Sequence, residues 1–225
     1  MQLSDRKSGE SGRAYALRTI KENIISLDLE PGSQISENDL AAEMGLSRTP
    51  VREAILDLSK VKIIEIYPQK KGVISLIDYD RIEECQFMRL NLEKAVVEEV
   101  CQRATEEELE KLWENVRLQD FYLENPDPRV MMELDNQFHG ILFDIARKPL
   151  VYRVINTVSI HFDRVRNLAL TAVKNVKFVH DHEDIASAVA DRDVRRACAI
   201  LDVHLNRYKA DAAVIREKYP QYIKK

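Results

Sequence analysis

Apolar residues recur every three or four positions along most of the chain, a spacing typical of helices with one buried face. The first such stretch covers residues 12–28 and has Leu17, Ile20 and Ile24 on one face. The sequence LEPGSQIS follows and interrupts the pattern with a proline and a glycine. The pattern therefore predicts a largely helical protein that begins with an amphipathic helix.

A short helix, a tight turn and a second helix are predicted next. Ser36 suits the N-cap of the short helix, and Gly45 suits the left-handed residue that ends it. Ser47 or Thr49 can cap the second helix. Pro50 is tolerated there because its missing N–H is no loss in a first turn.

A β-hairpin is predicted after the second helix. The segment KIIEIYPQKKGVISLI has β-branched residues on both sides of a Gln-Lys-Lys-Gly turn. A helix, a turn and a second helix with cationic residues in its first turn can present side chains to the major groove of DNA. A basic hairpin turn would lie beside the same duplex, so this part of the chain predicts a DNA-binding domain.

The net charge of −4 argues against a protein that coats nucleic acid through a general positive field. Phosphate attraction is local at physiological salt, however, so the grouping of charges matters more than their sum. Arg48, Arg52, Lys70 and Lys71 fall on two short predicted elements. Two readings of the arginines stay open here, either DNA contact or solvated charges on an amphipathic helix.

Residues 78–225 show helical periodicity throughout, with about six segments and no strand pattern or internal repeat. Breaks are predicted near residues 103–105, at ENPDPR, near 147–149, near 174–177 and at ADRD. The short segment LIDYD is the candidate linker. The sequence thus predicts a mostly α protein, with a winged helix-turn-helix domain over 1–77 and an all-helical bundle over 78–225.

Cysteine and hydropathy patterns exclude several classes of protein. Cys85, Cys101 and Cys198 are an odd number, lie far apart and stand among apolar residues, so they are interpreted as small buried hydrophobic residues and not as a disulfide framework or zinc site. No apolar run is long enough to cross a bilayer, and the N-terminus lacks the apolar stretch of a signal peptide. A cytoplasmic protein is expected.

Four polar residues lie on the apolar stripes of their predicted helices. Asp135 and His139 are four residues apart, and His182 and His204 follow on later helices. These side chains could converge inside a bundle as a metal site with three nitrogen ligands and one oxygen ligand. The alternative is that each histidine has its own hydrogen-bond partner, but one divalent ion would satisfy all four residues at once.

Charge counting at this site predicts an anionic ligand. A divalent ion, one carboxylate and three neutral imidazoles sum to about +1, which favours a small carboxylate at an open coordination position. Arg89 lies on an apolar helix face and needs an anionic partner, either that carboxylate or Glu93 four residues on. His161 is expected to line a pocket, and His180 to face solvent.

The run from PGSQISENDL through LSRTPVREAI to IIEIYPQKKGVISL resembles the winged helix-turn-helix of the GntR family of bacterial transcription regulators, over nearly all of residues 10–76. The resemblance implies DNA contacts at Arg48, Arg52 and Gly72, with Thr49 at a phosphate or base. Ser47 and Lys71 complete the predicted set of DNA-binding residues.

The stretches MRLNLEKAVVEEV, LDNQFHGILFDIA and DHEDIASAVADRDVRRACAILDVHL resemble the FadR-type ligand-binding domain, the FCD domain. In its metal-binding members the matching positions hold zinc, nickel or manganese next to an organic acid effector. The resemblance therefore implies metal ligation by Asp135, His139, His182 and His204, with zinc as the first choice. Arg89 is the predicted ligand-binding residue.

The combined prediction is a homodimeric regulator in which each winged helix reads half of a roughly palindromic operator and an effector at the metal changes operator affinity. A sensor of the metal itself, with no organic effector, is the alternative. Enzyme classes fit poorly because the chain has neither a His-Glu-x-x-His motif nor the paired Glu-x-x-His motifs of di-iron oxidases.

Overall fold

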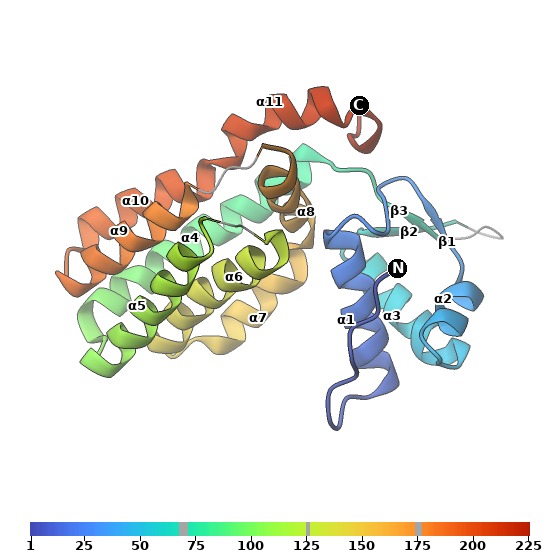
Figure 1. Ribbon diagram of the computed structural model, residues 1–225, viewed down its shortest axis with the longest axis horizontal. Helices are drawn as coiled ribbons and strands as arrows, with labels where there is room; N and C mark the ends of the chain where they lie inside the picture. Colours follow the sequence, from blue (N-terminus) through green and yellow to red (C-terminus); the bar gives the residue numbers. More distant parts are fainter. Residues whose placement is uncertain (68–71, 125–126, 174–176) are drawn as a thin grey trace. The chain divides into compact units, whose positions relative to one another are not determined.

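The computed structural model describes residues 1–67, 72–124, 127–173 and 177–225, with only the backbone described for 172 and 173 (Figure 1). Contacts between residues divide the chain into two compact units. The first combines Met1–Tyr79 with Tyr219–Lys225, and the second is Asp80–Lys218. The last seven residues thus fold with the N-terminal unit, although their sequence pattern predicts them as part of the C-terminal bundle.

Three helices form most of the first unit: α1 (Gly12–Ile25), α2 (Glu37–Glu43) and α3 (Arg48–Lys60). The Ser36 hydroxyl accepts a hydrogen bond from Asp39 N, as predicted for the cap of α2. Gly45 has a φ of +64°, which also agrees with its predicted role in the turn. Ser47 occupies the N-cap position of α3, but its side chain makes no capping hydrogen bond.

A three-stranded antiparallel sheet completes the helix-turn-helix unit. It consists of β1 (Gln34–Ile35), β2 (Ile64–Ile66) and β3 (Gly72–Ile74), in the order β1-β3-β2. The β2–β3 hairpin was predicted, whereas β1 was not, because a two-residue strand shows no alternation and depends on its distant partner. The predicted basic turn, with Lys70 and Lys71, lies outside the described residues.

The C-terminal segment joins the first unit through its backbone. Ile77 N donates to Tyr222 O over 2.7 Å, and Lys224 N donates to Ile77 O over 2.9 Å. The Lys224 ammonium also lies 2.7 Å from an Asp78 carboxylate oxygen. These contacts hold both ends of the first unit's chain together.

The second unit is helical over its described residues. It contains α4 (Tyr79–Arg103), α5 (Glu106–Phe121), α6 (Pro128–Ile145), α7 (Pro149–Val158), α8 (Ile160–Leu168), the π-helix η1 (Ala169–Val173), α9 (Phe178–Ala190), α10 (Val194–Asn206) and α11 (Tyr208–Lys218). The described residues therefore hold eight α-helices in this unit where about six were expected. The missed breaks, at Ser159 and Arg207, carry no glycine or proline, and both residues keep right-handed helical dihedral angles.

The core of the second unit lies between α4, α5, α6, α9 and α10. Its fully buried side chains include Val100, Leu112, Phe138, Ile185 and Leu201. None of the described helices is both long enough and apolar enough to cross a membrane. The three cysteines are free; Cys85 and Cys101 are buried and Cys198 is half-buried, in keeping with their interpretation as apolar residues.

Candidate metal centre

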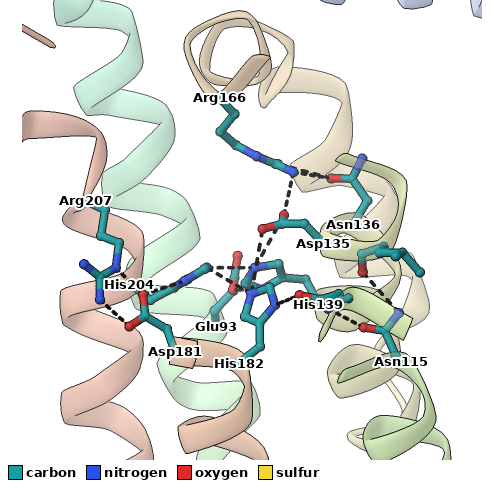
Figure 2. Close-up of polar contacts among 12 residues, drawn as sticks. Glu93, Asn115, Asp135, Asn136, His139, Arg166, Asp181, His182, His204 and Arg207 are labelled. Atoms are coloured by element: carbon teal, nitrogen blue, oxygen red, sulfur yellow. Dashed lines mark hydrogen bonds and ion pairs between the residues drawn. The ribbon is translucent and has the colours of Figure 1, made fainter. Parts of the chain in front are cut away.

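The four predicted metal ligands meet in the interior of the second unit (Figure 2). Asp135 and His139 come from α6, His182 from α9 and His204 from α10. Each offers one ligand atom, and these atoms all lie within 4.8 Å of one another. All four residues are buried, with His182 fully so.

The Nε2 atoms of the three histidines point toward a common centre. The Nε2 of His204 lies 3.2 Å from that of His139 and 3.4 Å from that of His182. Asp135 places one oxygen 3.9 Å from His139 Nε2 and the other 3.7 Å from His182 Nε2. Phe138 stacks on the His182 ring, with centroids 3.9 Å apart, and limits its rotation.

The other ring nitrogen of each histidine, Nδ1, faces a side-chain oxygen. The partners are Glu93 Oε2 at 2.7 Å from His139, Gln119 Oε1 at 2.8 Å from His182 and Asp181 Oδ2 at 3.4 Å from His204. Carboxylate and amide oxygens accept hydrogen bonds, so each Nδ1 should carry the imidazole hydrogen. In that tautomer each Nε2 presents a lone pair to the centre.

This arrangement fits a divalent cation. Bare lone pairs at such distances repel one another unless a positive charge lies between them. Two nitrogen ligands at the usual distance from a tetrahedral zinc ion stand about 3.3 Å apart, which agrees with the observed spacing. A protein metal site commonly has such a donor set of three imidazoles and one carboxylate. Its histidines commonly have an oxygen acceptor at the ring nitrogen that faces away from the metal.

Burial and charge favour the ligating protonation states. Burial lowers the pKa of His182 well below its ordinary value, and it also lowers that of His204, although Asp181 opposes the change. Burial raises the pKa of the Asp135 carboxyl, but Arg166 and the histidines outweigh this effect and hold it below the ordinary value. The histidines His182 and His204 are therefore neutral and Asp135 is ionised at neutral pH.

Arg89 forms the ion pair with Glu93 that the sequence left open. Its Nε lies 2.7 Å from Glu93 Oε1, and both side chains are buried. Burial raises the pKa of Glu93, but the nearby guanidinium more than compensates and lowers it to about 2. The second Glu93 oxygen faces His139, so Arg89 supports a candidate ligand through one intervening carboxylate.

Two further arginines that were not predicted from the sequence also contact the cluster: Arg207 through an intervening carboxylate, as Arg89 does, and Arg166 directly (Figure 2). Arg166, on α8, lies 2.5 Å from Asp135 Oδ2 and also donates to Asn136. Arg207, at the C-cap of α10, donates two hydrogen bonds to the Asp181 carboxylate. Arg166 also pairs with Asp163 on its own helix, but that spacing does not point to the cluster; the contacts of Arg166 with Asp135 and of Arg207 with Asp181 join different helices.

A cavity adjoins the centre and is open in part to solvent. Its wall combines the charged residues Arg89, Asp135, Arg166, His204, Arg207 and Asp211 with apolar and aromatic side chains such as Met132, Phe162 and Phe178. Asp135 and His204 thus belong both to the cluster and to the cavity. A small molecule in the cavity would therefore meet the candidate metal ligands and three guanidinium groups.

The predicted DNA-binding residues lie around the start of α3 and in the hairpin. Arg48, Thr49 and Arg52 are exposed in the first turns of α3, with Ser47 at its N-cap. Gly72 starts β3, where a Cβ would lie 3.1 Å from Ile35 Cγ1, so packing alone also favours glycine there. Lys71 lies outside the described residues.

The other two histidines differ from the cluster. His180 is exposed, as expected. His161 is buried beside Arg164, with 3.4 Å between their nitrogens, and does not belong to the cavity wall described above. Its expected place in a pocket is therefore not matched by this cavity.

Comparisons with known proteins agree with both halves of the chain. A family profile described as "FCD domain" matches residues 84–207, and one described as "Bacterial regulatory proteins, gntR family" matches residues 14–73. The HTH-type transcriptional repressor RspR of Escherichia coli K12 is 28% identical over 202 residues, 89% of each chain. An uncharacterized HTH-type transcriptional regulator in an unstable DNA locus of Streptomyces ambofaciens is 29% identical over 215 residues, 95% of this chain and 90% of the relative.

A solved structure shows the same fold. E. coli McbR/YncC superimposes with a TM-score of 0.79 at 18% sequence identity, covering 93% of this chain and 99% of that one. These relatives and this neighbour are regulators, not enzymes.

Proposed function

The chain belongs to the GntR family of bacterial transcriptional regulators and carries an FCD domain, and from this premise we propose that a small organic acid, bound at a divalent metal ion, sets its affinity for operator DNA. The observation that carries the proposal is the convergence of three histidine Nε2 atoms and one carboxylate beside a cavity. The DNA-binding function belongs to the family as a whole, whereas the acid and the metal are our inference.

The ion would be held by Asp135, His139, His182 and His204, with zinc as the first candidate and nickel or manganese as others. It would supply positive charge and an open coordination position at the edge of the cavity. The residues around it favour the ligating form of the imidazoles, because Gln119 Oε1 is hydrogen-bonded to His182 Nδ1 and carboxylate oxygens of Glu93 and Asp181 lie 2.7 and 3.4 Å from the Nδ1 atoms of His139 and His204.

A carboxylate is the ligand class that suits this cavity. Arg89, Arg166 and Arg207 line its wall, and guanidinium groups bind carboxylates through paired hydrogen bonds. Aromatic and aliphatic side chains cover the rest of the wall, so a short organic acid with an apolar portion fits better than an inorganic anion.

DNA would be contacted by the exposed start of α3. We assign Ser47, Arg48, Thr49 and Arg52 to this contact, together with Lys71 and Gly72 of the wing. A helix N-terminus offers amide donors to phosphate, and arginine can read guanine in the major groove. We further propose that two chains form a dimer, so that each reads half of a roughly palindromic operator in the cytoplasm.

One observation favours the alternative of a metal sensor with no organic effector. Each of the three cavity arginines already has a carboxylate partner: Glu93 for Arg89, Asp135 for Arg166 and Asp181 for Arg207. An incoming acid would have to share or replace these partners, which reduces the gain in binding free energy.

The experiment is a titration of operator affinity. An operator is first selected from random DNA, and its Kd is then measured for zinc-loaded and chelated protein with a panel of carboxylic acids. The corresponding neutral amides serve as controls. A Kd that changes with an acid only in the presence of zinc supports the proposal. A response to zinc alone supports the metal sensor, and a Kd that never changes refutes both.

A further inference from the structure

A series of buried amide side chains, joined by hydrogen bonds, extends from one of the candidate metal ligands. Asn115 Nδ2 donates to the Leu134 carbonyl over 3.1 Å, and Gln119 Nε2 donates to Asn115 Oδ1 over 2.5 Å. Gln119 Oε1 then lies 2.8 Å from His182 Nδ1. Asn115 and Gln119 are four residues apart on α5, and both are almost completely buried. We call this hydrogen-bonded pair of side chains, Asn115 and Gln119, the amide relay.

The direction of every hydrogen bond in the amide relay follows from its first member. A backbone carbonyl can only accept, so Asn115 must present its NH₂ group to Leu134 and its oxygen to Gln119. Gln119 must then donate to that oxygen and present its own carbonyl to His182. His182 Nδ1 faces an acceptor in consequence, and it must be the nitrogen that carries the hydrogen.

We propose that Asn115 and Gln119 are positioning residues that hold His182 in the ligating tautomer before any ion binds. Hydrogen sits on Nδ1, and the Nε2 lone pair points at the centre. This inference rests on the proposed metal site and adds two residues to its machinery. It also links the helices of two candidate ligands, because Leu134 precedes Asp135 on α6 while His182 lies on α9.

His182 needs the relay for a reason that does not apply to the other histidines. The Nδ1 atoms of His139 and His204 lie 2.7 and 3.4 Å from carboxylate oxygens, and a carboxylate can only accept, whichever oxygen it presents. An amide can instead present either its oxygen or its nitrogen. Gln119 therefore fixes the tautomer of His182 only because Asn115 fixes the orientation of Gln119.

The first test reads the tautomer directly. We expect ¹⁵N–¹H correlation spectra of the metal-free, full-length protein to show His182 with hydrogen on Nδ1. In the Asn115→Leu variant Gln119 is free to turn over, so we expect a mixture of tautomers. Hydrogen on Nε2 of His182 in the unmodified protein would overturn the proposal.

The second test measures zinc affinity by competition with a chelating dye. Gln119→Met removes the acceptor with little change in volume, and we expect zinc binding about 10- to 100-fold weaker, the usual effect of losing the partner of a ligating histidine. Gln86→Met is the matched control, since Gln86 is also buried in this unit but its amide makes no hydrogen bond to the cluster. Equal affinities in the two variants would contradict the proposal.

Gln119→Glu separates positioning from packing. A carboxylate at this position still accepts from His182, but its second oxygen would face Asn115 Oδ1, so the metal-free protein should be less stable. We expect zinc affinity within about threefold of the original despite this loss. Zinc affinity that falls in step with stability would indicate a purely structural role.

The outcomes also separate this inference from the proposed function. If the unmodified protein binds no divalent ion, the proposed metal function fails. The tautomer of His182 measured without metal still shows whether the amide relay sets that tautomer. If zinc binds normally but His182 carries hydrogen on Nε2, the proposed function stands and the relay fails.

Discussion

At the scale of single residues, the two nitrogens of each imidazole distinguish a candidate ligand from an ordinary core histidine. His139, His182 and His204 each have Nδ1 facing a side-chain oxygen and the other nitrogen at the shared centre. An ordinary buried histidine needs only one satisfied donor and a nearby acceptor. Three imidazole rings that direct the same nitrogen, Nε2, toward one point therefore indicate that they bind the same ion.

Substitution of one candidate ligand tests this directly. We expect His182→Ala to weaken zinc binding by more than about 100-fold, because even the loss of a partner behind a ligand costs about 10- to 100-fold. The measurement is zinc retained per chain after dialysis. His180→Ala is the control, since that exposed histidine lies two residues away on the same helix. Asp135→Asn repeats the test with little change in volume.

The cysteines give a second prediction at this scale. Burial raises the pKa of the Cys85 and Cys101 thiols to about 11 each, so at pH 7.5 almost none of either is thiolate. We expect both to resist alkylation in the folded protein and to react readily in denaturant, with Cys198 the first to react. Mass spectrometry of timed iodoacetamide samples would show this order, and rapid labelling of Cys85 would contradict it.

At the scale of elements, local signals predicted most of the helices and the hairpin. The capping serine of α2, the glycine after it and the proline-rich loop before α6 mark their boundaries by local chemistry. The strand β1 and the bends at Ser159 and Arg207 depend on tertiary packing, which a local pattern does not contain.

In the candidate site, too, local spacing predicted some residues and not others. Asp135 and His139 were predictable because their four-residue spacing places them on one apolar stripe. Arg166 and Arg207 carried no such signal, since each meets a carboxylate on another helix. Asn115 and Gln119 did carry one, as two amides four apart on the buried face of α5, and that pattern could have marked them.

The turn between α2 and α3 gives a prediction about backbone conformation. Gly45 has a φ of +64°, and no atom lies within 4 Å of a Cβ built on it, so Gly45→Ala would act through backbone strain alone. We expect a loss of about 1 kcal/mol in the free energy of unfolding. Gly12→Ala is the matched control, because it lies in α1 without a positive φ and its Cβ would make ordinary contacts. Hydrogen exchange of α1 and α3 amides would compare the variants, and equal protection in both would contradict the prediction.

At the scale of the whole molecule, a regulator must combine one surface that reads DNA with a second that responds to a ligand. In the proposed function these roles fall to different units, because α3 lies in the first unit and the histidine cluster in the second. The chain passes between the units twice, after Tyr79 and after Lys218. Both connections can therefore carry a change of conformation.

The proposed contact of α3 with DNA is tested by its arginines. We expect Arg48→Ala or Arg52→Ala to weaken operator binding by about 5- to 150-fold, the range for loss of one bidentate contact to a base. Arg153→Ala, an exposed arginine in the second unit, controls for the change in net charge. Fluorescence anisotropy with labelled operator measures the affinities. An unchanged Kd for both α3 variants would mean that these arginines are only solvated charges.

The second connection gives the last prediction, deletion of Tyr219–Lys225. Ile77 would lose two backbone hydrogen bonds, to Tyr222 and Lys224, and the burial of Ile223 would also be lost. Together these should lower the stability of the first unit by about 3 kcal/mol. Lys224→Ala is the control and should cost less than the deletion, since it removes only the ion pair between an exposed lysine and the buried carboxylate of Asp78 and keeps both backbone hydrogen bonds of Ile77. Hydrogen exchange at the Ile77 amide measures the difference. The helix α11 follows directly on Arg207 and leads into this segment. If protection at Ile77 is unchanged after the deletion, the second connection does not transmit a change from the candidate metal ligands to the first unit.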